Sequence, residues 1–130
     1  MRIVEPIESV KHEFFEVTLI IARAGSAAHV AQTKIEGDKI REREGRDELT
    51  DEEYGEAYAH AMAGTCLVGW ENFVLDGAPV PFTIENARSL LVDDNYALEF
   101  VLRHAMNQSQ FMAKASEDSK KKLSQVSGGN

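Results

Sequence analysis

The segment TDEEYGEAYAHAM, at residues 50–62, decides the fold class because it opens with a complete helix-start signature. The Thr50 hydroxyl can accept a hydrogen bond from the backbone amide of Glu53, and the Glu53 carboxylate can accept one from the amide of Thr50. Acidic residues also crowd the first turn, where the positive end of the helix dipole stabilises them. The predicted helix runs to about Cys66. Its apolar face carries Tyr54, Ala57, Tyr58, Ala61, Met62 and Thr65.

Helix signals also precede and follow this segment. Ser26 can cap a helix over residues 27–35, after which the alternating acids and bases of residues 34–51 indicate a solvated helix that frays into a loop. Residues 96–112 keep apolar side chains three and four apart throughout, which predicts the best-formed helix of the chain.

A shorter helix is expected between these two regions. Thr83 can cap a helix over residues 84–92, and Asp93 and Asp94 would end it and cap the next one. Its buried face is expected to carry Ile84, Ala87, Leu90 and Leu91.

A strand is predicted near the N-terminus, because residues 13–21 are rich in β-branched and aromatic side chains. The residues that would share one face of this strand are Phe15, Val17, Leu19 and Ile21. A helix is the alternative, and its inward residues would be Phe14, Phe15, Thr18, Leu19 and Ala22. The periodicity alone does not separate these two interpretations.

A hairpin-like segment is predicted near residues 73–82. The pair Asp76-Gly77 supplies the positive φ of a tight turn, and Pro79 and Pro81 stiffen the returning chain. Trp70 precedes this segment. We interpret Trp70 as a core anchor that fixes the hairpin against the helices, with an exposed binding hot spot as the alternative.

These elements predict a mainly α fold. Residues 1–115 are expected to form a single small helical domain with a short β element, and residues 116–130 a flexible, disordered polar tail. A chain of 130 residues suits one domain, and its 43% of hydrophobic residues is ordinary for a globular protein. No disulfide is expected, because Cys66 is the one cysteine.

Charge and apolar run length limit the partners. The formal net charge is −8, and the acidic excess lies before residue 113, so a basic or apolar protein partner is expected and nucleic acid is not. The longest apolar run, residues 17–24, is too short to span a bilayer, so no membrane partner is expected. Residues 1–6 lack the profile of a secretory signal, which favours the cytoplasm.

No residue pattern predicts catalysis, so an enzyme is not expected, and neither is a cofactor or a metal. The histidines His12, His29, His60 and His104 do not fall into zinc-binding spacings with each other or with Cys66. The acidic cluster at residues 47–56 lies beside a helix start, where negative charge stabilises the helix. No glycine-rich loop has the lysine and hydroxyl companions that would bind phosphate.

The ordered motifs of residues 67–91 resemble those of the tail assembly chaperones of long-tailed bacteriophages with non-contractile tails. A tryptophan segment, residues 67–73, precedes an Asp-Gly turn, a Pro-Phe-Thr step and a short helix with an Asn and paired leucines. The residues that carry the resemblance are Gly69, Trp70, Asp76, Gly77, Pro81, Phe82, Asn86, Leu90 and Leu91. Most of these are expected to be structural.

The resemblance implies a protein of the host cell cytoplasm that binds the long, helical tape measure protein and promotes tail tube polymerisation. It would be absent from the mature virion. A tail tube protein would be a second partner, through a longer product made by ribosomal frameshifting. We interpret the run Lys120–Lys122 as a solvated charge run, with adenine-rich codons on which a ribosome slips as the alternative. Weak homo-oligomers are also expected, because the strand at residues 13–21 has only a short hairpin to pair with inside the chain.

Two other functions fit the same sequence. One is a small structural part of the particle, either a head-tail connector or a tail terminator. The other is an acidic, protein-binding regulatory subunit or an enzyme with an acidic cleft at residues 47–56, which would require buried carboxylates with strongly perturbed pKa values.

Overall fold

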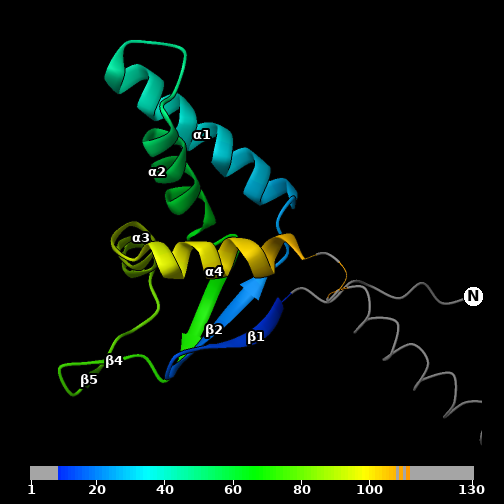
Figure 1. The fold of residues 1–130 in the computed structure, drawn as a ribbon, viewed down its shortest axis with the longest axis vertical. Helices are drawn as coiled ribbons and strands as arrows, with labels where there is room; N and C mark the ends of the chain where they lie inside the picture. Colours follow the sequence, from blue (N-terminus) through cyan, green and yellow to red (C-terminus); the bar gives the residue numbers. More distant parts are fainter. Residues whose placement is uncertain (1–8, 108, 110, 112–130) are drawn as a thin grey trace, which may run out of the picture.

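The computed structural model describes residues 9–107, 109 and 111 (Figure 1). In chain order these residues form β1 (Ser9–Phe14), β2 (Val17–Ala22), α1 (Ala27–Glu44), α2 (Asp51–Met62), β3 (Leu67–Glu71), β4 (Val74–Leu75), β5 (Ala78–Pro79), α3 (Ile84–Asp93) and α4 (Asn95–Met106). The fold is therefore mainly helical with small antiparallel sheets, as the sequence predicts. The predicted tail, residues 116–130, lies outside the described residues, and so does the lysine run Lys120–Lys122.

The core lies between the first sheet and the helices. The sheet is antiparallel with strand order β1-β2-β3, and α4 crosses one of its faces while the α1–α2 pair projects away from it (Figure 1). The largest fully buried side chains are Phe111, Leu19, Ile21, Met62, Leu67, Leu91, Val101 and Cys66. Burial raises the pKa of the Cys66 thiol to about 11.

The strand predicted at residues 13–21 is confirmed over residues 17–21 but wrong as a single continuous strand, and its helical alternative is wrong. The chain turns at Phe15 and Glu16, so that β1 and β2 form a hairpin in which Phe14 is opposite Val17. Phe15 has a positive φ of 54° and is 86% exposed. The alternation was correct within β2, where Leu19 and Ile21 are fully buried.

The segment around Trp70 is a strand, which the sequence analysis missed. β3 pairs with β2 in a register that places Trp70 opposite Leu19. The preceding helix α2 ends at Met62 rather than Cys66, because Gly64 takes a φ of +88° and its amide donates a hydrogen bond to the carbonyl of Leu67. The chain therefore turns directly from α2 into the sheet.

Helix α1 is longer than predicted. It continues through the charged stretch to Glu44 and ends at Gly45, whose φ of 68° is left-handed and whose amide donates to the carbonyl of Arg41. Charges three and four residues apart are paired, as in Arg41 with Asp38, which stabilises a helix that buries little apolar surface. The Ser26 cap is confirmed, since its side chain accepts from the amide of His29.

The last two helices begin at the predicted caps, but their lengths and buried faces differ from the prediction. Thr83 caps α3, and the Asp94 carboxylate accepts from the amides of Tyr96 and Ala97 to cap α4. Ile84 is 46% exposed rather than buried. Helix α4 ends at Met106, whereas the sequence predicts a helix that runs to residue 112. None of the described helices is long and apolar enough to cross a bilayer.

Candidate functional site

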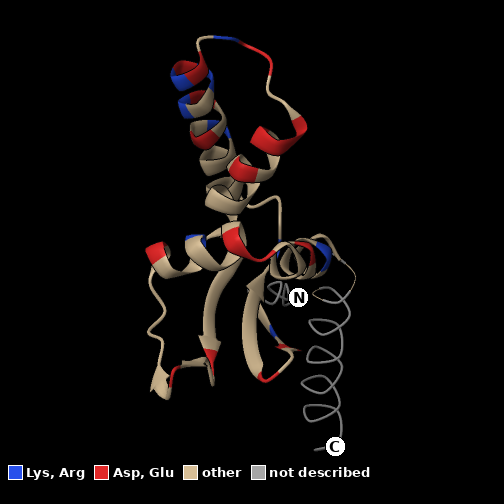
Figure 2. Cartoon of the chain, turned by 60° about the vertical axis from the view of Figure 1, so that its left-hand side comes forward, with Lys and Arg blue, Asp and Glu red and all other residues tan. Residues whose placement is uncertain are grey.

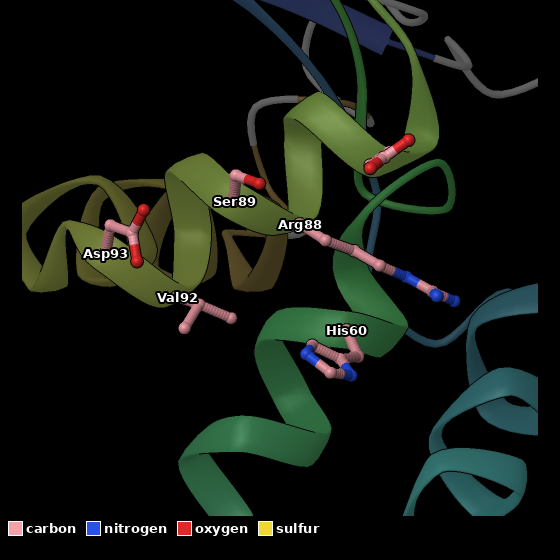
Figure 3. Close-up of a pocket in the computed structure, with 6 residues that line it drawn as sticks. His60, Arg88, Ser89, Val92 and Asp93 are labelled. Carbon is pink, nitrogen blue, oxygen red and sulfur yellow. The ribbon is translucent and has the colours of Figure 1, made fainter.

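A groove lies between α2 and α3. It consists of two hollows of about 510 and 440 Å³ that meet at Val92, a residue that lines both. We call this surface the α2–α3 groove. Its first hollow is lined by His60, Glu85, Arg88, Ser89, Val92 and Asp93. In Figure 3, Val92 projects from α3 toward α2, and Arg88 extends from α3 past His60.

Helix α2 is held at its start by the predicted capping box. The Thr50 amide donates to the Glu53 carboxylate at 2.8 Å, and the Glu53 amide donates to the Thr50 hydroxyl at 3.2 Å. Arg46 also contacts the Glu53 carboxylate at 2.6 Å. The hydrogen bond from the Thr50 backbone, followed by the bond from Arg46, lowers the pKa of Glu53 to about 2.

Acidification should weaken the fold through Glu53. Its carboxyl has an ordinary pKa of 4.5 in the unfolded chain and about 2 in the folded chain, so the unfolded state takes up the proton first. The stabilisation is therefore complete above a pH of about 4.5 and is lost as the pH falls through about 2. The melting temperature of a Glu53→Gln variant should fall less steeply over this range than that of the wild type. Identical slopes would contradict the role of this carboxylate.

A buried carboxylate joins three helices on one side of the groove. Glu36 of α1 is 3% exposed, and Arg88 of α3 approaches it at 3.2 Å while His60 of α2 lies 3.5 Å away. Gln32 donates to it at 2.9 Å, and Lys39 does so at 3.3 Å. Burial raises the pKa of Glu36, but the hydrogen bonds from Gln32 and Lys39 and the charges of Lys39 and Arg88 outweigh burial and lower it..

The carboxylates of this region are held in their charged form by hydrogen bonds and ion pairs. A general acid needs a pKa raised toward neutrality, whereas the pKa values of Glu36, Glu53 and Glu56 are all lowered. For Glu56 the main cause is the hydrogen bond from Arg43. Within the described part of the chain, no three His, Cys, Asp or Glu side chains gather to hold a metal ion.

The second hollow of the groove combines an apolar floor with an acidic rim. Leu91 and Ala59 form part of the floor and are fully or almost fully buried, while Val92 is 47% exposed. Asp51 and Glu52 lie on the rim in the first turn of α2, and they form no ion pair among residues 9–107. Figure 2 shows this acidic colouring at the start of α2.

A separate hollow of about 490 Å³ lies where the start of α1 meets α2 and the end of α4. Val30, Tyr58 and Met106 line it and are 59%, 40% and 60% exposed. The predicted apolar stripe of α2 is thus only partly buried, since Tyr54 is 42% exposed and stacks on Tyr58 with the ring centroids 6.3 Å apart. His29, Thr33 and Lys34 also line this hollow, and none of its lining residues is a carboxylate.

The residues that carry the motif resemblance form an interlocked unit around Trp70. The Trp70 ring centroid lies 4.8 Å from those of Phe73 and Phe82, and its indole nitrogen donates to the carbonyl of Val80 at 2.8 Å. The Asn86 side chain donates to the carbonyl of Pro81 at 2.9 Å. Trp70 is partly buried and packs against the buried core, which agrees with its interpretation as a core anchor.

The other motif residues are spread along the same segment. Gly69 is buried against Ile20, where a Cβ atom would lie 3.1 Å from the Ile20 Cδ1 atom. Asp76 and Gly77 form the predicted turn between β4 and β5 with φ values of 52° and 77°, and neither residue lines the groove. Leu91 is fully buried and Leu90 only partly.

Sequence reasoning missed the residues that shape the groove. Glu36 and Arg88 are 52 residues apart and give no local signal of their contact. Gly55 could have been noticed, because an isolated glycine inside a helical pattern lowers helix stability and calls for a packing or functional reason.

The fold and these surfaces define a small, mainly helical protein with open grooves and a structural aromatic motif. Residues 20–122 match the family described as YdaY prophage protein, and the chain belongs to that family. It is therefore a phage-associated protein. No curated protein and no solved structure matches the chain.

Proposed function

We propose that this prophage protein is a tail assembly chaperone that binds the tape measure protein and promotes tail tube polymerisation. The observation that carries the proposal is the interlocked unit around Trp70. The motif pieces of residues 67–91 are individually common, but Trp70, Phe82 and Asn86 are joined by ring contacts and hydrogen bonds in one folded unit. This folded unit supports the interpretation that the ordered motif is a feature of the tail assembly chaperone family.

The surface of the protein supports a helical, apolar-striped partner. Val30, Val92 and Met106 expose roughly half of their surface at concave sites, where apolar side chains of a partner could be covered. The net charge of −8 favours a basic partner over nucleic acid. Under the proposal the protein acts in the host cell cytoplasm without catalytic chemistry.

The tail tube protein is the second proposed partner, reached through a frameshifted longer product. Synonymous recoding of the Lys120–Lys122 codons should abolish the longer product and tail formation, because the repetitive message would be lost. Lys→Gln changes that preserve slippage should leave both intact. Immunoblotting of induced cells with an antibody to the short form measures both products. Normal tails after recoding would reject this part of the proposal.

Weak self-association stays a prediction, and the sheet edges support it. The strand β2 is not unpaired, because it lies between β1 and β3. Within the described residues β1 and β3 are the sheet edges, and unpaired edges can join a second chain. Light scattering at high protein concentration should show a mass above the monomer. A strictly monomeric species, alone and with the tape measure protein, would contradict the prediction.

The proposal is tested by deleting the gene from an inducible prophage. We expect particles without tails, rescue by a plasmid copy, and no copy of the protein in rescued, purified virions. Normal tails in the deletion strain would reject the proposal. A fixed number of copies in each virion would instead identify a head-tail connector or a tail terminator. If the protein is instead recovered in a complex with an unrelated enzyme, that result would favour the regulatory-subunit alternative.

A further inference from the structure

We propose that the α2–α3 groove binds a basic amphipathic helix, packed closely against Gly55, and, resting on the proposed function, that the tape measure protein supplies it. Three features of this surface support the proposal. Nothing within the described chain requires a glycine at position 55, the floor of the groove is apolar, and its rim is acidic.

Gly55 lies inside α2, where glycine is the least favourable residue after proline. Its φ is not positive, and a Cβ atom built on it would meet no atom within 4 Å. Neither backbone conformation nor packing within the described chain therefore requires glycine. Gly55 lines the second hollow of the groove. A missing side chain at this place allows the backbone of another molecule to approach closely.

The floor beneath Gly55 suits the apolar face of a helix. Ala59 and Leu91 are buried and Leu98 packs against the core, so this floor is held rigidly by α2, α3 and α4. Val92 stands between the two hollows and is 47% exposed. A helix laid along the groove would cover Val92 with side chains spaced three or four residues apart.

The charges of the rim select a basic helix. Asp51 and Glu52 border the second hollow and Asp93 the first, and none of them forms an ion pair within the described part of the chain. Lys or Arg residues flanking the apolar stripe of the partner would complement these carboxylates. The hollow beside Tyr58 is lined by His29 and Lys34 instead and lacks this complementarity.

Two matched pairs of variants test the groove, with the full-length chain titrated against immobilised tape measure protein of the same prophage. Gly55→Ala should raise the melting temperature, because alanine favours the helix, and weaken binding by about tenfold through overpacking of the contact. Gly37→Ala is the control for binding, because Gly37 lies inside α1 and does not line the groove, so this variant should bind as the wild type does. It does not control for the melting temperature, because Gly37 is buried and a Cβ atom there would lie 3.2 Å from the Arg41 Nη1 atom.

Glu52→Lys should also weaken binding by about tenfold, because it places a base on the acidic rim. Glu42→Lys changes the net charge equally at an exposed position of α1 outside the groove, and should bind as the wild type does. If the wild type binds and both groove variants bind equally well, the groove assignment fails while the proposed function stands. If the wild type itself does not bind, the proposed function fails.

The occupant is identified by cross-linking. Ser89 is exposed on the groove, so Ser89→Cys can carry a photo-reactive maleimide, while the native Cys66 is buried. We expect light-induced cross-links to the tape measure protein in co-purified complexes. Cross-links confined to residues 113–130, which contain Lys120–Lys122, or to a second copy of the chain would overturn the assignment.

Discussion

Replacing Trp70 with alanine should lower the free energy of unfolding by about 3–5 kcal/mol, as deletions of large aromatic side chains from packed positions do. The substitution removes ring contacts with Phe73 and Phe82, leaves the carbonyl of Val80 without its indole donor, and opens space beside the core. Chemical denaturation of the variant measures this loss.

The Trp70→Phe variant separates packing from hydrogen bonding at the same site. It keeps an aromatic ring but removes the donor to Val80, so we expect a loss of about 1–2 kcal/mol. If Trp70→Ala unfolds at the same denaturant concentration as the wild type, Trp70 is not a core anchor and the hot-spot alternative returns.

The second large effect is expected at Leu91. This side chain is fully buried in the core, so Leu91→Ala should cost about 2–5 kcal/mol of folding free energy. Leu90 is the matched control, because it is the same residue type one position earlier but only partly buried. Leu90→Ala should therefore cost clearly less, measured by the same denaturation.

The comparison of the two leucines also tests the orientation of α3. The sequence analysis placed both Leu90 and Leu91 on the buried face of this helix, and the structure assigns full burial to Leu91 alone. Equal losses of folding free energy in the two variants would mean that α3 is rotated relative to the core. Leu91 would then not form the floor of the groove as described.

Helix starts were the most predictable part of the fold. Ser26, Thr50, Thr83 and Asp94 all cap the helices expected of them. This success has a local cause, since a capping side chain bonds an amide two or three residues away and the whole interaction is contained in a short stretch of sequence. Helix ends were less predictable, because α2 stops where Gly64 turns the chain toward the sheet.

The sheet was predicted poorly because its signals are not local. β1 alternates partly buried residues with the exposed Lys11 and Glu13, and that pattern is weak in so short a strand. The turn at Phe15 and Glu16 uses residues that are not typical turn formers. β3 is recognisable only once β2 lies beside it.

The groove could be anticipated only at one residue. The acidic first turn of α2 was visible in the sequence, but it was interpreted as a stabilised helix start. The link from Arg88 to Glu36 spans 52 residues, and the pairing of α2 with α3 also joins elements that are distant in the sequence. Gly55 is the groove residue that stands out in the sequence. Glycine is unfavourable inside a helix, and no contact within the described chain requires it at this position.

Binding to the tape measure protein is the most direct test of the proposed chaperone function. The full-length chain and the tape measure protein of the same prophage are co-expressed, and a tag on the chain is used to recover complexes from the soluble fraction. The account predicts that the tape measure protein is soluble and co-purifies with the chain, and that it is largely insoluble when expressed alone. A tape measure protein that stays insoluble and is never recovered with the chain would contradict the account.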